Sequence, residues 1–183
     1  MVYISGGNEL LSPLAILKLL DISEGQKIAD LGCGRTGHFV IPAAKMVGKK
    51  GQVYAVDILK SVLQTVVSRA REEGLGNVRP IWSNLEIYEA TKIKDDFLDI
   101  ALLINTLFQT KEDEAIIKEA KRMMKKAGKL LVVDWNQTAV PFGPPLVDRT
   151  KEGEIKKIAK KLDLKLIKSF PAGPYHYGLI FEK

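Results

Sequence analysis

Cysteine and histidine are scarce in this sequence. Its 183 residues contain a single cysteine, Cys33, and two histidines, His38 and His176. One cysteine cannot form an internal disulfide, and it excludes a zinc cluster built from cysteines. The acidic residues also do not cluster with the histidines at the spacing of metal ligands. We therefore expect neither a disulfide framework nor a metal site.

Long apolar runs, low-complexity tracts and internal repeats are missing as well. No apolar stretch reaches the roughly 20 residues that a membrane span requires. The first ten residues, MVYISGGNEL, have neither the basic start nor the apolar middle of a secretory signal peptide. Hydrophobic residues still make up 46% of the chain, which is typical of a globular protein. The sequence predicts a cytoplasmic protein, not inserted in a membrane, with a single domain over residues 1–183.

Positive charge is in moderate excess, with a formal net charge of +6. Basic proteins can bind nucleic acid, but the distribution of the charge matters more than its sum. Many of the lysines fall in two runs that also carry an apolar face, and these are Lys118, Lys121, Lys125 and Lys126, then Lys156, Lys157, Lys160 and Lys161. This pattern favours the solvated faces of two amphipathic helices. Binding of RNA is the second interpretation.

The most informative stretch is a glycine-rich turn between two apolar segments, in residues 27–40, KIADLGCGRTGHFV. Apolar residues ending in Asp30 come first, three glycines follow, and an apolar run begins at Phe39. This order predicts a buried strand, a tight turn and the start of a helix. Glycine tolerates positive φ and lets a ligand approach the main chain, and the N–H groups at a helix start point toward such a ligand. The stretch therefore predicts a nucleotide-type site.

Two cofactors compete for this turn. Gly32 to Gly37 read as G-x-G-x-x-G, the dinucleotide fingerprint of NAD sites. Asp30 argues against NAD, because the strand before that fingerprint is usually apolar, whereas a carboxylate there suits the ammonium group of S-adenosylmethionine. A second acid, Asp57, ends the next strand and can accept hydrogen bonds from both ribose hydroxyls. That feature serves either cofactor, so it does not discriminate between them.

The rest of the chain alternates strands and helices. After the strand before the glycine turn, further strands are predicted over residues 53–57, 78–82, 100–104, 129–133, 164–170 and 177–182. Helices are predicted over 14–20, where Ser12 is the N-cap, and over 39–47, 60–73, 112–124 and 152–162. Only a short turn, 171–176, joins the last two strands, so this pair must be antiparallel, since a parallel crossover needs a dozen or more residues. The chain therefore predicts an α/β fold with one antiparallel strand.

The motif ADLGCG with a downstream YAVD resembles the class I S-adenosylmethionine-dependent methyltransferases, in particular their ubiquinone/menaquinone-biosynthesis-like branch. The resemblance covers roughly residues 10–183. It implies a Rossmann-like three-layer sandwich around a seven-stranded, mostly parallel sheet with an antiparallel last strand. One departure concerns the turn itself. The family usually has D-x-G-x-G-x-G, and here Thr36 delays the third glycine by one place.

The resemblance implies S-adenosyl-L-methionine as the cofactor and a set of residues that bind it. The set is Asp30, Gly32, Cys33, Gly34, Gly37, His38, Asp57, Ile58, Asn84, Leu85 and Asn105. Asn84 aligns with the place where the family contacts the adenine amino group, but an asparagine after a strand can equally close a turn. His38 lies at the start of a helix, where it lines the site rather than carrying chemistry.

Catalytic side chains are harder to assign, because positioning alone can lower a methyl-transfer barrier by roughly 7–11 kcal/mol. The candidates are His176, in the last turn, and Asp134, after the fifth strand. Trp135, Phe142 and Tyr175 are candidates for an apolar pocket that holds a small-molecule acceptor. That pocket must be assembled from an N-terminal lid or brace in residues 1–24, the 105–110 segment, the 136–150 loop and the final turn. Residues 1–11 are predicted to be mobile.

Three functions remain open from the sequence. The first is a small-molecule methyltransferase whose acceptor and oligomeric state are not identified. The second is an RNA or protein methyltransferase, although the prolines of the usual base-methylating motif are absent after Asn105. The third is a non-catalytic nucleotide-binding module, with NAD as its candidate ligand.

Overall fold

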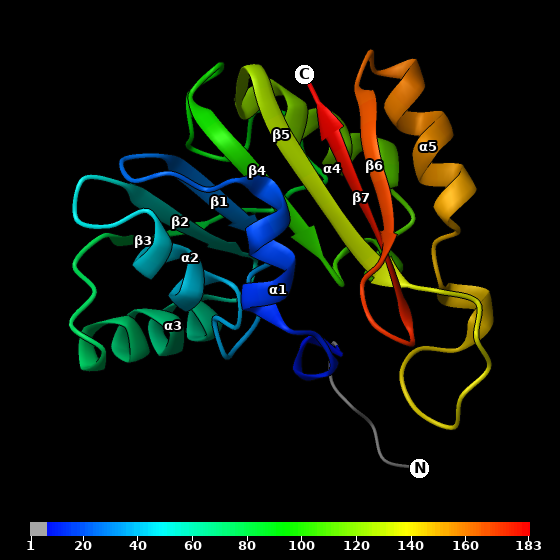
Figure 1. Cartoon of the computed structure of the whole chain (residues 1–183), viewed down its shortest axis with the longest axis horizontal. Helices are drawn as coiled ribbons and strands as arrows, with labels where there is room; N and C mark the ends of the chain where they lie inside the picture. The colour runs from blue at the N-terminus through cyan, green and yellow to red at the C-terminus, as the bar shows by residue number, and fades with distance from the viewer. Residues whose placement is uncertain (1–6) are drawn as a thin grey trace.

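The computed structural model of the chain describes residues 7–183, and its seven strands form one sheet between two layers of helices (Figure 1). The strands are β1 (Lys27–Leu31), β2 (Gln52–Asp57), β3 (Val78–Trp82), β4 (Leu98–Ile104), β5 (Met124–Trp135), β6 (Lys165–Pro171) and β7 (His176–Glu182). The α-helices are α1 (Pro13–Leu17), α2 (Val40–Met46), α3 (Lys60–Glu72), α4 (Asp113–Met123) and α5 (Glu152–Lys161). Single 3₁₀ turns are η1 (Asn8–Leu10), η2 (Lys18–Leu20), η3 (Leu107–Gln109) and η4 (Leu146–Asp148).

The strand order in the sheet is β3-β2-β1-β4-β5-β7-β6. β7 runs antiparallel to both of its neighbours, while the pairs among β1 to β5 are parallel. The predicted hairpin of the last two strands is thereby confirmed, as are the α/β class and the Rossmann-like seven-stranded sheet. The strand order and directions also bring several strand ends together. The carboxyl ends of β1, β2, β4 and β5 lie along one edge of the sheet, the lower edge in Figure 1, and β7 begins at that same edge.

Each face of the sheet has its own apolar core. The α1–η2 segment, α2 and α3 cover one face, where Leu17, Val40 and Val66 pack on the sheet (Figure 1). α4 and α5 cover the other face through residues such as Ile117 and Ile155. The central strand β4 is buried on both sides, which explains its continuous apolar run.

The segment between β3 and β4, residues 83–97, contains no helix, and an ion pair on α4 holds it. Glu119 is fully buried and accepts backbone N–H groups from Glu89 and Thr91 at 2.9 and 3.1 Å. Arg122 donates to both carboxylate oxygens of Glu119, each at 2.8 Å, and to the carbonyl of Ile93. Burial would raise the pKa of Glu119, but the hydrogen bonds from Arg122 and the two N–H groups hold it below its ordinary value. A buried charge pair therefore replaces helix packing at this place in the fold.

The start of β5 differs from the sequence prediction. α4 ends at Met123 and β5 begins at once, so Lys125 and Lys126 lie on a strand and not on a helix face. Met124 pairs with Leu98, and the register of β4 and β5 then shifts before Ile100. Ala127, next to Gly128 in this irregular stretch, has a positive φ. The apolar pattern of residues 129–133 did not predict this irregularity.

The N-terminal segment is more ordered than predicted where the structure describes it. Residues 7–10 form a turn that reaches the carboxyl edge of the sheet, while residues 1–6 of the predicted mobile stretch lie outside the described residues. α1 does begin at Pro13, but Ser12 makes no side-chain capping hydrogen bond. α1 packs on the sheet face through Ile16 and Leu17. The segment thus combines packing on the sheet with contacts at the site.

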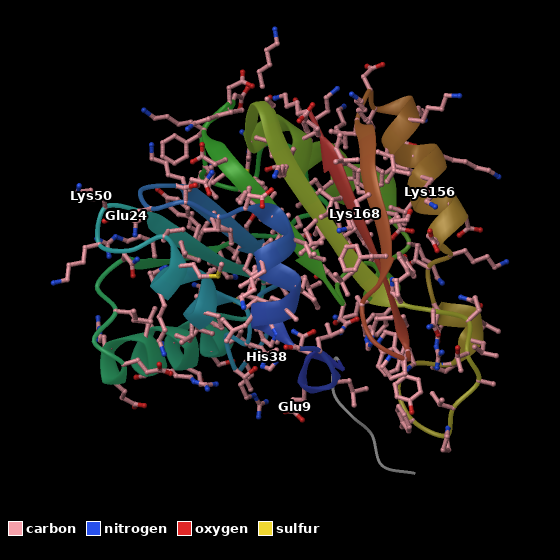
Figure 2. All side chains as sticks on the ribbon, in the orientation of Figure 1. Glu9, Glu24, His38, Lys50, Lys156 and Lys168 are labelled. Carbon is pink, nitrogen blue, oxygen red and sulfur yellow. The ribbon has the colours of Figure 1, made fainter. Side chains whose placement is uncertain are left out.

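The second lysine run agrees with a solvated helix face, and so do Lys118 and Lys121 of the first. Lys156 pairs with Glu152, Lys161 with Glu114, and Lys121 with Asp163. Figure 2 shows Lys156 on α5, far from His38 beside the glycine turn. Within residues 7–183, no helix combines the length and the apolarity needed to cross a membrane.

Candidate functional site

The carboxyl edge of the sheet gathers most of the polar residues that the sequence singled out. Asp30 lies near the end of β1, Asp57 ends β2, Asn105 follows β4, Trp135 ends β5 and His176 begins β7. Trp135 and His176 are direct partners in the β5–β7 ladder. Figure 2 shows His38 and Glu9 at the same edge, from two segments far apart in sequence.

The glycine turn after β1 is clamped against β2. The N–H groups of Gly32 and Cys33 both donate to the carbonyl of Val56, at 2.9 and 3.0 Å. The Gly34 N–H donates to Oδ2 of Asp57 at 3.2 Å, and the Leu59 N–H donates to Oδ1 at 2.9 Å. Asp57 thus braces the turn, and each of its oxygens keeps a further lone pair for a ligand.

Gly32 is required by sterics. Its φ is +85°, and an added Cβ would lie 2.7 Å from Oγ1 of Thr106. Thr106 is held there because its hydroxyl donates to the carbonyl of Leu31 at 3.0 Å. Only glycine lets the turn pass under the end of β4 at this distance.

Asp30 is a buried acid beside a second acid. Its side chain is 2% exposed. Burial, and then the charge of Asp57, raise the pKa of Asp30 to about 7. Asp57 is therefore close enough to Asp30 to raise its pKa, and the glycine turn lies between the two acids in the chain. A cation bound between these two acids would favour the ionised form of both.

Asn105 holds the end of β4 in an unusual conformation. Its φ is +53°, which is uncommon for a residue other than glycine. Its Nδ2 donates to Oδ1 of Asn8 at 2.8 Å, and its Oδ1 is buried with no donor among residues 7–183. Asn8 also lies nearest to the open side of Gly34. The N-terminal turn therefore reaches between the glycine turn and β4, with one acceptor left unpaired.

The loops after β2 and β3 form an exposed apolar surface. Ile58 is 54% exposed and Trp82 is 58% exposed, and the indole N–H of Trp82 donates to the Ile58 carbonyl at 2.8 Å. Leu85 is buried, and Oδ1 of Asn84 accepts the Glu86 N–H at 3.0 Å. Asn84 thus closes a turn here. Its Oδ1 keeps a second lone pair, so the bond from the adenine amino group to this oxygen stays a prediction.

The remaining members of the predicted cofactor set lie around the turn. Gly37 has a φ of +57° and faces Val66 of α3. A ring nitrogen of His38 is 3.1 Å from the carbonyl of Leu11, so this histidine ties the glycine turn to the N-terminal segment. The thiol of Cys33 is buried, and burial raises its pKa above the usual range.

Both oxygens of the Asp134 carboxyl accept backbone N–H groups. One oxygen accepts the N–H groups of Leu107 and Phe108, at 3.1 and 3.2 Å, and the other accepts the N–H of Trp135 at 2.7 Å. Burial raises the pKa of Asp134 to about 7, although these three bonds oppose the shift. The carboxyl therefore shapes the η3 turn beside the site.

His176 and Trp135 form a buried aromatic pair. Their ring centroids are 4.5 Å apart, and Phe142 and Tyr175 stack edge to face beside them. Both ring nitrogens of His176 and the indole N–H of Trp135 have no hydrogen-bond partner among residues 7–183. Burial, and then the charge of Arg149, lower the pKa of His176 to about 4, so the imidazole is neutral at physiological pH.

An open groove of about 600 Å³ borders this aromatic pair. One wall comes from residues 108–112 and the other from residues 143–145 of the proline-rich loop. Gly143 also contacts the Trp135 indole, where an added Cβ would lie 2.5 Å from the ring. The volume is typical of small-molecule sites. Two of the four segments predicted to build the acceptor pocket, 105–110 and 136–150, thus meet at this groove, whereas neither the final turn nor the N-terminal segment lines it, so the full pocket stays a prediction.

Sequence reasoning did not single out three residues that the site contains. Asn8 and Thr106 make their contacts with Asn105 and Leu31 only after folding, so no local motif marks them. Arg149 lies in the proline-rich loop and directly follows Asp148 in the sequence, so no sequence signal marked it as a residue of the site.

Comparisons with known proteins agree on one family. A family model described as a methyltransferase domain matches residues 22–169. The ubiquinone/menaquinone biosynthesis C-methyltransferase UbiE of Vibrio vulnificus (strain YJ016) is 31% identical over 114 residues, covering 62% of this chain and 42% of that protein. UbiE of Shewanella woodyi is 33% identical over the same length, covering 62% and 44%. The chain thus spans less than half the length of these relatives.

Solved structures give the same result over nearly the whole chain. An S-adenosylmethionine-dependent methyltransferase from Aquifex aeolicus has a TM-score of 0.85 at 26% identity, covering 97% of this chain and 93% of that one. The [4+2]-cyclase SpnF has a TM-score of 0.77 at 15% identity, covering 92% and 80%. At that identity the second match shows the fold alone, and it is a reminder that one fold can host different chemistry.

Proposed function

The chain belongs to the class I family of S-adenosylmethionine-dependent methyltransferases, and from this membership we propose that it transfers the cofactor's methyl group to a small molecule. The acceptor would bind at the carboxyl ends of β4 and β5 and at the start of β7. One observation carries the proposal. Unpaired buried polar atoms at Asn105, Trp135 and His176 continue the edge that begins with the two acids of the cofactor cleft. The UbiE relatives are named for methylation of quinone precursors, which supports an aromatic acceptor.

The residues of the cleft fit S-adenosylmethionine. We assign Asp30 and Oδ1 of Asn105 to the cofactor's ammonium group, because Asp30 is a buried acid and the Asn105 oxygen has no donor among residues 7–183. Asp57 would take the ribose hydroxyls, and Ile58, Asn84 and Leu85 would surround the adenine. A pyrophosphate would suit this cleft poorly, since its charge would oppose both carboxylates.

The protein's contribution to the reaction is positioning and exclusion of water. When bound, the cofactor supplies a methyl group on a sulfonium, which is transferred by in-line displacement. Trp135 and Phe142 provide an apolar wall, and Gly7 packs against the indole from the N-terminal turn. Holding acceptor and donor in line can supply roughly 7–11 kcal/mol. His176 is only a weak base, because its pKa is lowered to about 4, and Asp134 is engaged by three N–H groups, so positioning is proposed to contribute more than proton removal.

Transfer of a radioactive methyl group tests the proposal. The protein would be incubated with methyl-labelled S-adenosylmethionine and, separately, with 1,4-naphthoquinol, hydroxybenzoates, bulk tRNA and a protein extract. We expect label in the small organic fraction. Label in tRNA or protein would establish the second candidate class. Binding of the cofactor without any transfer would favour a non-catalytic module.

The protonation of Asp30 leads to a prediction about pH. Because the pKa of Asp30 is about 7 in the free protein, a cationic ligand must displace a proton below that pH. The affinity for S-adenosylhomocysteine, which keeps the ammonium group, should therefore fall by up to about tenfold per pH unit below 7 and level off above it. Titration calorimetry at pH 6, in two buffers of different ionisation enthalpy, should detect the released proton.

The matched variant for this measurement is Asp30→Asn. It should bind S-adenosylhomocysteine more weakly at pH 8 and show almost no dependence on pH between 5 and 8. A wild-type affinity that does not change over this range would contradict the assignment of Asp30 to the ammonium group.

A further inference from the structure

The aromatic cluster at the end of β5 contains a buried positive charge without a negative partner. Arg149 is 5% exposed, and its guanidinium carbon lies 5.1 Å from the centre of the Trp135 ring. It forms no salt bridge with any acid in residues 7–183, in contrast to the equally buried Arg122 on α4, which pairs with Glu119. Residues 1–6, MVYISG, include no acid either. The chain therefore supplies no counter-ion for Arg149.

The hydrogen bonds of Arg149 explain its position but leave its charge uncompensated. Nε donates to the carbonyl of Pro144 at 3.0 Å, and Nη1 donates to the carbonyls of Asn136 and Thr138 at 2.8 and 2.7 Å. These bonds fasten the proline-rich loop over Trp135. They use Nε and Nη1, so the second terminal nitrogen, Nη2, keeps its donors. A buried guanidinium normally gains a carboxylate or phosphate, because an unpaired buried charge is costly.

Two other groups around the same indole also lack partners. The Trp135 N–H is a donor only, and the neutral His176 ring offers one donor and one acceptor. Both side chains are at least 99% buried. Gly7 and Gly143 both lie so close to the indole that an added Cβ on either would meet ring atoms, and Gly143 also lines the groove. Buried donors therefore outnumber acceptors around the indole, behind the part of the groove wall that Gly143 forms.

We infer that Arg149, Trp135 and His176 form a subsite for an anionic oxygen of the methyl acceptor, carried by an aromatic ring as a carboxylate or a phenolate. The inference rests on the proposed function and names the acceptor class. A guanidinium and an indole N–H donate to such an oxygen, and the neutral imidazole adds a third donor. Phe142 and Tyr175 give the ring of the acceptor apolar neighbours. The subsite selects anionic over neutral rings because only an anion compensates Arg149.

Binding of simple probes tests this subsite. With saturating S-adenosylhomocysteine, calorimetry would compare benzoate with its neutral isostere benzamide, and 4-nitrophenolate with 4-nitroanisole at pH 8.5. We expect each anion to bind at least tenfold more tightly than its neutral partner. A larger preference for benzoate identifies a carboxylate, and a larger one for the nitrophenolate identifies a phenolate. Equal affinity within both pairs, or no binding of either anion, would overturn the inference.

Variants separate the charge from the packing. Arg149→Met should abolish the preference for anions, and Arg149→Lys should keep part of it. Arg79→Met is the matched control, because Arg79 also donates to backbone carbonyls but lies on the exposed edge strand β3. The Arg79→Met protein should keep the wild-type preference for anions. Should Arg149→Met fail to fold, Trp135→Phe, which removes the N–H and keeps a ring, should weaken anion binding several-fold. Full anion preference in Arg149→Met would also overturn the inference.

The proposed function and the anionic subsite can be disproved separately. If S-adenosylhomocysteine does not bind the wild-type protein, the proposed function fails, whatever the probes do. If S-adenosylhomocysteine binds and benzoate is not preferred to benzamide, only the anionic subsite is wrong.

Discussion

Replacing Asp57 with alanine is expected to weaken binding of S-adenosylhomocysteine by roughly 10- to 100-fold. A carboxylate that accepts hydrogen bonds from two hydroxyls contributes about 1.5–3 kcal/mol, and each 1.4 kcal/mol is a factor of ten. The loss has a second origin in this protein, because Asp57 also holds the Gly34 N–H and therefore the shape of the glycine turn. Titration calorimetry at pH 8, where Asp30 is ionised, gives the affinity directly.

Two variants distinguish the causes. Asp57→Asn keeps an oxygen that can accept one bond, so its loss should be smaller than that of Asp57→Ala. Asp99→Ala is the matched control at the opposite end of the sheet, where the carboxylate also accepts a backbone N–H, from Lys27 at 2.7 Å. It should change stability and leave the affinity intact. An unchanged affinity in Asp57→Ala would remove Asp57 from the ribose site.

Replacing Gly32 with alanine is expected to lower the free energy of unfolding by roughly 2–5 kcal/mol. Left-handed backbone costs about 1–2 kcal/mol for a residue with a Cβ. The new methyl group would also lie 2.7 Å from Oγ1 and 2.9 Å from Cγ2 of Thr106, and such overpacking costs about 1–3 kcal/mol. Cofactor binding should be lost with it, because the turn cannot stay under the end of β4. Urea unfolding followed by circular dichroism measures the first effect.

A double-mutant cycle with Thr106 identifies the steric part. Thr106→Ala alone should cost about 1 kcal/mol through its lost bond to the Leu31 carbonyl. In the Gly32→Ala background it should instead restore stability, because it removes the atoms that clash. Gly153→Ala is the control: it lies in α5 with no neighbour within 4 Å of the added Cβ, and it should stabilise the protein by about 0.5–1 kcal/mol. Additive effects of Gly32→Ala and Thr106→Ala would argue against the contact.

Several elements were predictable because their determinants are local. The helix predicted over residues 60–73 is α3, and the glycine that follows it, Gly74, has a φ of +70°. The Leu75 N–H donates to the carbonyl of Ala70 at this helix end. The hairpin followed from chain length, since six residues cannot make a parallel crossover. β5 was predicted too short, because its first residues owe their strand conformation to pairing with Leu98 and not to their own apolar pattern.

The residues of the candidate site also differ in how far the sequence predicted their roles. Asp30, the glycines and Asp57 follow one another within a short segment, so the pattern of the cofactor cleft could be read along the chain. The roles of His176 and Asp134 could not. Their predicted part in acid–base chemistry stays a prediction, but the sequence did not show that burial lowers the pKa of His176 or that three N–H groups engage Asp134. Solvation and partners of a side chain come from residues that are distant in sequence.

The sequence by itself determined the fold class, the family and the nature of the cofactor, because periodicity, glycine placement and the length of connections act over a few neighbouring residues. Only the tertiary structure decided which polar groups are satisfied and which are not. Asn105 donates a hydrogen bond to Asn8, 97 positions away in the sequence. Arg149 lies over the Trp135 ring and forms no salt bridge with an acid among residues 7–183. Free energies of burial and charge depend on everything that packs around a group, and that environment exists only once β4, β5 and β7 have come together.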